Sequence, residues 1–149
     1  MKQAKPGVFF SFVYWVLGPF FRLVHPQRTR GRQNIPAEPV IFVANHSSMI
    51  DPFMLSLAVR RRNRAYFMAK KELFRFPLRG VLRLLGAFPV DRETGGGVSA
   101  IKTALRYLKN GQNVLMFPEG TRVSEAEQVA AKTGAIRIAM QANVPIVPV

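Results

Sequence analysis

The sequence predicts an α/β domain whose largely parallel sheet is flanked by helices, with an aromatic membrane-docking helix at the N-terminus. Short apolar runs of strand length alternate with segments of helical periodicity from residue 32 onward, and this alternation is typical of parallel βαβ units. The 149 residues, 48% of them hydrophobic, suffice for one domain with its own core. Cysteine is absent, which excludes a disulfide framework, a thiolate metal site and a cysteine nucleophile.

The first predicted element is a helix in the apolar stretch 8–21, with Lys2 and Lys5 before it and Arg22 after it. The stretch is shorter than the roughly 20 apolar residues of a transmembrane helix. Gly18-Pro19 interrupts it, and no signal-peptide cleavage site follows. We expect a helix in the interface at the cytoplasmic face of the cell membrane, with its flanking cations on lipid headgroups; the alternative is a core helix packed on its own domain. The side chains expected in the acyl boundary are Phe9, Phe10, Phe12, Trp15, Phe20 and Phe21.

The remaining elements follow from apolar runs and periodicity in chain order. Strands are predicted at 40–44, 65–69, 88–90, 114–117 and 144–149. Helices are predicted at 52–59, 78–85, 98–108 and 130–143. The second and third of these helices are followed by Gly86 and Gly111, which are suitable C-terminal stops. Gly95-Gly96-Gly97 is predicted to be a loop or hinge.

The formal net charge of +14 predicts an anionic partner: lipid headgroups, phosphorylated substrates or nucleic acid. Basic residues cluster at 22–32, 60–64 and 70–83, and no zinc-finger, RNP-like or basic-zipper pattern is present. The aromatic residues gather in the N-terminal stretch and are not interleaved with the basic ones. This distribution favours an anionic membrane surface and argues against nucleic acid.

The segment 45–51, Asn-His-Ser-Ser-Met-Ile-Asp, places His46 five residues before Asp51, directly after a predicted buried strand. A histidine with a nearby carboxylate is the minimal set for general base catalysis. Residues five apart diverge in a regular helix or strand, so the two side chains meet only if the chain turns between them. Asp51-Pro52 supplies a strand-to-helix corner, because Asp suits an N-cap and Pro the first helical position. The alternative is that Asp51 only caps a helix and His46 is a hydrogen-bonded loop residue.

Two further polar segments follow predicted strands, where loops of a parallel sheet converge on a crevice. Arg92 and Arg122 carry planar guanidinium groups suited to bidentate phosphate binding. Lys70 and Lys71 would add point charges, and Gly120 would let a ligand approach the backbone closely. The alternative for each arginine is an ordinary surface cation or a salt bridge, for instance Arg92 with Asp91 or Glu93.

Four ordered motifs together resemble the glycerolipid acyltransferases, specifically the 1-acyl-glycerol-3-phosphate (lysophosphatidate) acyltransferases. Asn45, His46 and Asp51 match the Asn-His-x4-Asp motif, and 86–92 resembles the second motif. The third, Phe-Pro-Glu-Gly-Thr-Arg, stands at 117–122, and the fourth, Val-Pro-Ile-Val-Pro-Val, at 144–149. The resemblance divides the chain into a membrane-interface helix and basic linker at 1–31 and an acyltransferase domain at 32–149. Because family domains usually continue beyond the fourth motif, we expect this domain to be C-terminally incomplete, with an exposed sheet edge after Val149.

The resemblance implies transfer of a fatty acyl group from acyl-CoA or acyl-carrier protein to the sn-2 hydroxyl of lysophosphatidate, giving phosphatidate in phospholipid biosynthesis. His46 would be the general base, and Asp51 would orient it. The residues implied to bind the glycerol phosphate or shape its pocket are Lys70, Arg92, Glu119, Gly120, Thr121 and Arg122. No metal or cofactor beyond the acyl donor is expected. The open alternatives are another acceptor, such as glycerol 3-phosphate or a lysophospholipid, and a truncated, inactive protein that binds membranes peripherally.

Overall fold

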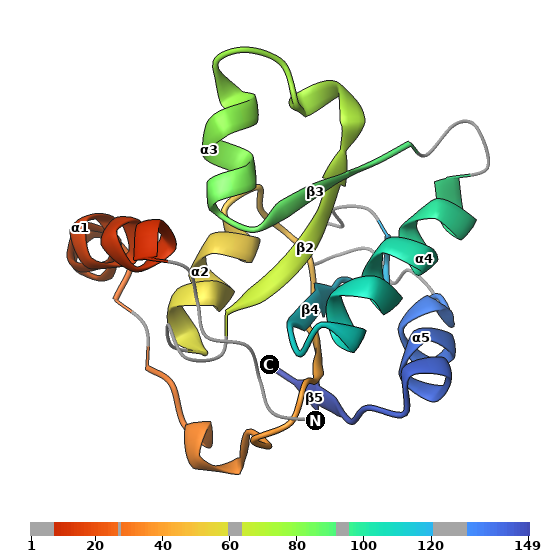
Figure 1. The fold of residues 1–149 in the computed structure, drawn as a ribbon. Helices are drawn as coiled ribbons and strands as arrows, with labels where there is room; N and C mark the ends of the chain where they lie inside the picture. Colours follow the sequence, from red (N-terminus) through yellow and green to blue (C-terminus); the bar gives the residue numbers. More distant parts are fainter. Residues whose placement is uncertain (1–7, 27, 60–63, 92–95, 121–130) are drawn as a thin grey trace.

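The computed structural model describes residues 8–26, 28–59, 64–91, 96–120 and 131–149, and within them it contains one five-stranded sheet with the strand order β3-β2-β4-β1-β5 (Figure 1). The strands are β1 (Ile41–Val43), β2 (Ala65–Lys70), β3 (Ala87–Val90), β4 (Asn113–Met116) and β5 (Ile146–Pro148). Every neighbouring pair is parallel, so the predicted α/β class is confirmed. All five predicted strands are present, and each start or end differs from the prediction by at most two residues.

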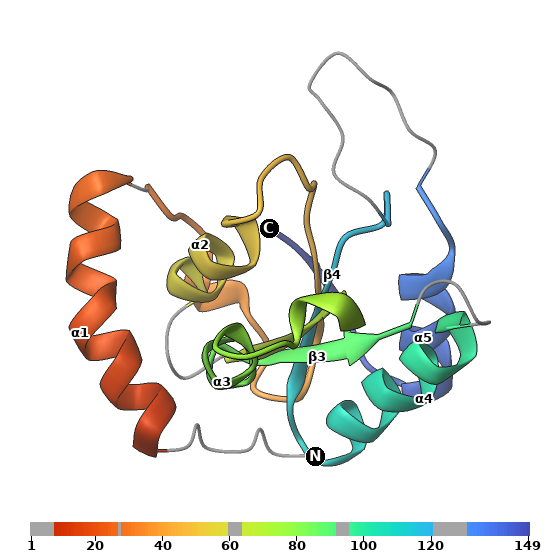
Figure 2. The ribbon, with the colours of Figure 1, turned by 90° about the horizontal axis from the view of Figure 1, so that it is seen from above.

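The helices form two layers, one on each face of the sheet (Figures 1 and 2). The helices α2 (Asp51–Ala58) and α3 (Leu78–Leu84) cover one face, and α1 (Val8–Val24) packs on the outside of α2. The helices α4 (Gly96–Lys109) and α5 (Gly134–Ala142) cover the other face. Two short 3-10 helices lie at Arg32–Asn34 and Lys71–Leu73.

Alternating side chains of the central strands fill a core on each face. Phe42 of β1 and Leu115 of β4 pack toward α2 and α3. Ile41 and Val114 point the other way, against α4 and α5. All four side chains are at most 2% exposed, which explains why these strands are continuously apolar in the sequence.

Two predicted boundaries differ from the structure. Gly96 and Gly97 open helix α4 and do not form a hinge, because Ala100, Ala104 and Leu108 give this segment a buried face at helical spacing; Gly95 lies outside the described residues. Helix α5 begins at Gly134, although the prediction extended it back to Ala130, which the structure does not describe.

Helix α1 continues through Pro19, so Gly18-Pro19 interrupts the apolar run but not the helix. One side of α1 packs on the domain: Gly18 is buried and the Phe21 ring stacks on Phe53 of α2 at 5.6 Å. Phe21 therefore packs on the protein. The prediction that its side chain lies in the acyl boundary is wrong. The opposite side is exposed and apolar, with Trp15 74% exposed, which does not fit a helix enclosed in its own domain. Within the described residues, no helix is long and apolar enough to cross a membrane.

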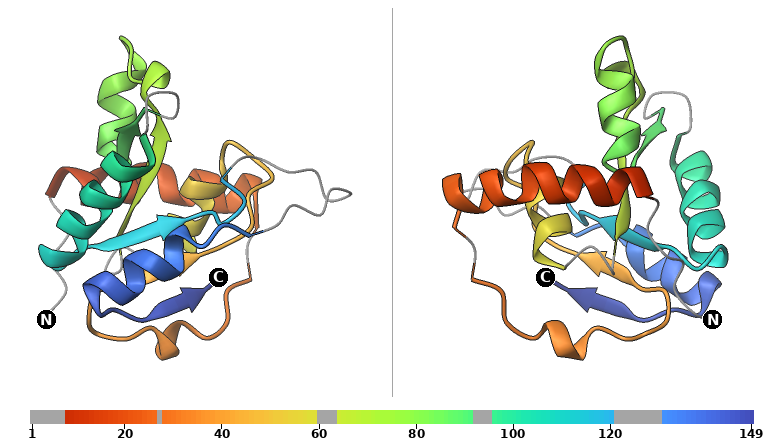
Figure 3. Two further views of the ribbon diagram at one scale, coloured as in Figure 1. Left: turned by 90° about the vertical axis from the view of Figure 1, so that its right-hand side faces the viewer. Right: turned by 60° about the vertical axis from the view of Figure 1, so that its left-hand side comes forward.

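The segment 28–40 runs along β5, the strand at this edge of the sheet (Figure 3). Between this segment, β5 and the end of α2 lies a cavity of about 440 Å³, whose lining includes Arg28, Arg32 and Val149. The Arg32 guanidinium donates a hydrogen bond of 2.6 Å to the Ala58 carbonyl at the end of α2. Cations near the last turn of a helix complement its dipole, so Arg32 holds the segment against α2.

Candidate active site

The site forms where the loops after β1 and β4 meet at the carboxyl end of the sheet. The two strands are neighbours in register, with Val43 paired with Met116. His46 and Glu119 each lie three residues beyond this pair, and the His46 backbone N–H donates a hydrogen bond of 3.1 Å to Glu119 Oε2. The register of the parallel sheet therefore brings together two segments 73 residues apart.

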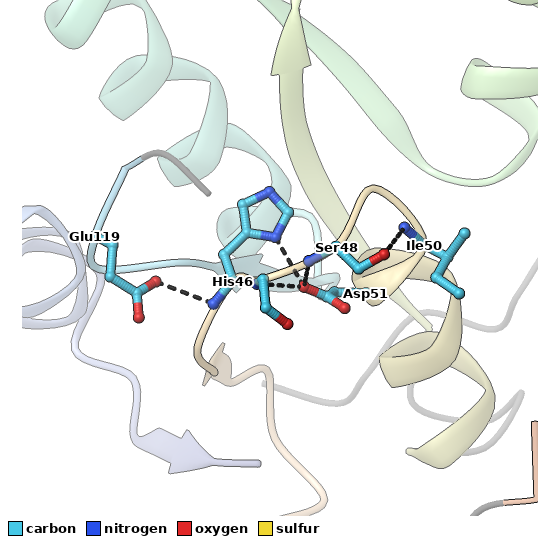
Figure 4. Close-up of polar contacts among 6 residues, drawn as sticks. His46, Ser48, Ile50, Asp51 and Glu119 are labelled. Carbon is cyan, nitrogen blue, oxygen red and sulfur yellow. Dashed lines mark hydrogen bonds and ion pairs between the residues drawn. The ribbon is translucent and has the colours of Figure 1, made fainter. Parts of the chain in front are cut away.

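His46 and Asp51 meet across the strand-to-helix corner, with His46 Nδ1 3.0 Å from Asp51 Oδ2 (Figure 4). The carboxylate also accepts backbone N–H hydrogen bonds from Ser47 at 2.8 Å and Ser48 at 2.7 Å. The prediction that Asp51 is the N-cap is wrong: Ile50 holds that position and Asp51 is the first residue of α2. Its side chain is turned back into the loop, where it orients the imidazole.

Asp51 remains ionised in this setting. Partial burial opposes ionisation, but the hydrogen bonds from Ser48, His46 and Ser47 outweigh it and hold the pKa of Asp51 below its ordinary value. An ionised carboxylate only accepts hydrogen bonds, so Nδ1 of His46 must carry the proton that points at Asp51. The other nitrogen, Nε2, is then the basic atom of the neutral ring, and it points away from Asp51 (Figure 4).

The face of the His46 imidazole is covered by Phe117. The two rings stack with centroids 4.1 Å apart and planes 20° from parallel. Ring pairs of this kind contribute about 0.5–1.5 kcal/mol beyond their buried area. The His46 side chain is 17% exposed and that of Asp51 20%, so the pair is sheltered yet open to a substrate.

The other predicted site residues differ in where they lie. Glu119 contacts the His46 backbone, as described above. Gly120 adopts a φ of +70°, and a Cβ there would lie 2.9 Å from the Lys132 Nζ. Lys70 is exposed at the end of β2, with β4 between it and β1. Arg92, Thr121 and Arg122 lie outside the described residues, so the expectations for them remain predictions.

Lys71 was expected to add charge to the phosphate pocket. Its Nζ lies 3.7 Å from Asp91 Oδ2 instead, and its side chain is 67% exposed. This exposed ion pair joins the carboxyl ends of β2 and β3 and contributes little stability by itself.

Two residues of the site are absent from the predicted site residues. Phe117 entered the predictions as the end of a strand and the first residue of the third motif, but with no role at the site, although alternation along β4 puts it on the same face as the buried Leu115. Lys132 comes after the segment 121–130 in the sequence. Its backbone N–H donates a hydrogen bond of 2.9 Å to the Pro118 carbonyl. The sequence contains no signal that Lys132 lies close to Gly120.

The arrangement fits proton transfer from a hydroxyl group. It supplies an imidazole whose Nδ1 faces a carboxylate that stabilises the imidazolium, and a lysine ammonium beside the neighbouring loop. In the part of the chain that the structure describes, no three His, Asp or Glu side chains are grouped so that they could hold a metal ion. The cavity beside β5 is lined by neither His46 nor Asp51.

Comparison with known proteins also relates the chain to acyltransferases. A family model described as "Acyltransferase" matches residues 27–149. The 1-acyl-sn-glycerol-3-phosphate acyltransferase of Bacillus subtilis (strain 168) is 41% identical over 119 residues, which cover 78% of this chain and 58% of that protein. The human 1-acyl-sn-glycerol-3-phosphate acyltransferase beta is 33% identical over 142 residues, which cover 93% of this chain and 48% of the relative. The chain thus spans about half the length of these two curated relatives.

The fold is also similar to that of a solved structure. It is the crystal structure of the 1-acyl-sn-glycerophosphate (LPA) acyltransferase PlsC from Thermotoga maritima, with a TM-score of 0.64 and 26% sequence identity. The superposition covers 95% of this chain and 70% of that one. The five-stranded sheet and its flanking helices therefore match the architecture of a lysophosphatidate acyltransferase.

Proposed function

The chain belongs to the acyltransferase family, and from this premise we propose that it transfers a fatty acyl group from a thioester to the sn-2 hydroxyl of 1-acyl-glycerol 3-phosphate, giving phosphatidate. The observation that carries the proposal is the 3.0 Å contact between His46 Nδ1 and Asp51, which leaves Nε2 as the base. The names of the relatives, given above, supply the class of acceptor.

In the proposed reaction His46 Nε2 removes the proton of the acceptor hydroxyl as its oxygen attacks the thioester carbonyl carbon. A C–O bond forms, the C–S bond breaks, and the thiolate leaving group takes the proton back from the imidazolium. Asp51 stabilises the imidazolium between the two steps, since its lowered pKa keeps it charged. General base catalysis contributes typically about 10²–10⁴-fold, so positioning of the acceptor must supply much of the remaining acceleration.

The phosphate of the acceptor would bind near the loop after β4. Lys132 Nζ lies above Gly120, one residue beyond Glu119, and its ammonium can donate up to three hydrogen bonds. Lys70 lies at the same carboxyl end of the sheet, as the last residue of β2. Arg92, Thr121 and Arg122 remain predicted members of the pocket. The proposed acyl donor is acyl-CoA or acyl-carrier protein.

Helix α1 would hold the enzyme at an anionic membrane surface, where a lysophospholipid acceptor resides. Its exposed apolar side chains recur at helical spacing and share one side of the helix: Val8, Phe12, Trp15, Val16, Phe20 and Leu23. Such an apolar stripe is typical of helices that lie in the membrane interface. The net charge of +14 of the chain would add attraction to anionic lipids. The cytoplasmic face of the cell membrane is the proposed location.

The test is a panel of acceptors presented in anionic vesicles, with products identified by lipid mass spectrometry. The acceptors are lysophosphatidate, glycerol 3-phosphate, lysophosphatidylcholine and monoacylglycerol, each with acyl-CoA and with acyl-carrier protein. We expect phosphatidate from lysophosphatidate and no product from monoacylglycerol, which lacks the phosphate. Preference for glycerol 3-phosphate or lysophosphatidylcholine would contradict the proposed acceptor, and vesicle binding without turnover on any acceptor would contradict the enzyme.

The same assay tests the phosphate pocket. Lys132→Ala should raise the KM for lysophosphatidate roughly ten-fold, because a hydrogen bond to a charged group is lost, with little change in kcat. The matched control is Lys102→Ala, which removes an exposed lysine from α4 and from none of the loops that form the site. Equal KM values for the two variants would exclude Lys132 from the pocket.

A further inference from the structure

We propose that Phe117 is a positioning residue for His46, whose ring fixes the plane of the imidazole so that Nε2 is aimed at the acceptor hydroxyl. The inference rests on the proposed role of His46 as the base. It assigns a function to a residue that belongs to neither the histidine-aspartate pair nor the proposed phosphate pocket.

The first part of the argument is geometric. The hydrogen bond from Nδ1 to Asp51 fixes one atom of the imidazole, and a ring held at one atom can still tilt about that contact. Phe117 lies against the face of the ring, with centroids 4.1 Å apart and planes 20° from parallel. The edge contact with Asp51 and the face contact with Phe117 together restrict both the position and the plane of the ring.

The second part is that Phe117 is itself held in place. It follows β4 directly, and its side chain packs against the buried cluster that includes Phe42 and Leu115. Because protein cores are close-packed, a ring anchored there transmits their rigidity to the imidazole. The Asp51 contact comes from the start of α2, directly after the His46 loop, whereas Phe117 connects that loop to the buried cluster beside β4.

The third part is that Phe117 and Glu119 act on His46 from the same loop. Glu119 accepts the His46 backbone N–H at 3.1 Å, which fixes the main chain, while Phe117 fixes the side chain. A substrate that binds to the loop after β4 therefore meets a base whose orientation that loop sets. A displacement of about 1 Å in a catalytic group can lower a rate by about 100-fold, so such control of orientation matters.

The experiment compares Phe117→Leu, which keeps an apolar side chain but removes the ring, with Phe117→Tyr, which restores a ring. The matched control is Phe74→Leu, because Phe74 packs against the same cluster and contacts the core without belonging to the site. We expect Phe117→Leu to lower kcat roughly ten-fold with KM within about two-fold. Phe117→Tyr should recover most of the loss, and Phe74→Leu should change kcat less than about two-fold.

A dependence on His46 distinguishes positioning from a general loss of structure. In a His46→Ala background, Phe117→Leu should lower the residual rate no further, since the ring that it orients is gone. The proposal is overturned if Phe117→Leu and Phe74→Leu reduce kcat equally, if Phe117→Tyr fails to recover activity, or if Phe117→Leu still lowers the rate without His46.

An NMR measurement keeps the inference separate from the proposed reaction. The stacked Phe117 ring should shift the His46 ring protons upfield, and this shift should vanish in Phe117→Leu and persist in Phe117→Tyr. If the wild-type chain shows the shift but no acyl transfer, the proposed function fails and the held imidazole stands. An unshifted His46 ring in the wild-type chain would refute the positioning role whatever the activity.

Discussion

The two ends of the sheet use polar side chains in opposite ways. At the amino end, Asn113 of β4 accepts the Val40 backbone N–H at 3.0 Å and donates to the Arg64 carbonyl at 3.3 Å. At the carboxyl end, His46 and Asp51 contact each other, and Nε2 of His46 points away from that contact (Figure 4). Asn113 is 2% exposed, whereas the His46 side chain is 17% exposed.

This difference shows how one strand pair serves both stability and the proposed chemistry. Asn113 ties the starts of β1 and β2 to β4, and one of its hydrogen bonds satisfies the backbone N–H of Val40, a residue that is 0% exposed. His46 gives up one nitrogen to Asp51 and keeps the other as a base. Sites in parallel sheets gather at the carboxyl end, and here the amino end carries the structural hydrogen bonds.

The largest effect on stability is expected at the amino end. Asn113→Ala should lower the free energy of unfolding by about 1–3 kcal/mol, because it removes the partner of the buried Val40 N–H, while kcat of the folded fraction changes little. Chemical denaturation and an activity assay measure the two quantities. The matched control, Asn110→Ala, removes an exposed asparagine before the same strand and should stay within about 0.5 kcal/mol. A large fall in kcat for Asn113→Ala would contradict a purely structural role for the amino end of the sheet.

A smaller, pH-dependent effect is expected at the carboxyl end. The pKa of Asp51 is lower in the folded chain than its ordinary value, so its contribution to stability is complete above the ordinary carboxyl pKa of about 4 and is lost as the pH falls through the lowered folded pKa. The Tm difference between the wild-type chain and Asp51→Asn should therefore shrink as the pH falls below about 4. A difference that widens below about pH 4 would contradict the hydrogen bonds assigned to this carboxylate.

The sequence was sufficient to predict the order and type of the main elements, because the apolar runs of parallel strands are buried on both faces. The corner at Asp51-Pro52 also predicted that His46 and Asp51 meet, since no regular element could bring them together. The cap assignment failed because the Asp51 carboxylate accepts backbone hydrogen bonds from Ser47 and Ser48, which precede it in the chain.

Contacts between distant segments could not be predicted in the same way. Stacking of Phe117 on His46 requires the register of β1 against β4, and an apolar residue at a strand end carries no sign of it. The approach of Lys132 to Gly120 depends on the return of the chain after residue 130. The packing of Phe21 on Phe53 likewise needed the position of α1 on α2, because every side of an aromatic-rich helix looks suited to lipid.

The most direct measurement of the central claim is phosphatidate formation by the chain and by His46→Ala in anionic vesicles. The control is His25→Ala, which removes the only other histidine of the chain, an exposed residue just after α1. We predict that His46→Ala loses at least about 100-fold in kcat while vesicle binding is unchanged, and that His25→Ala retains wild-type turnover. Acyl transfer by His46→Ala at the wild-type rate would contradict the assignment of His46 as the general base.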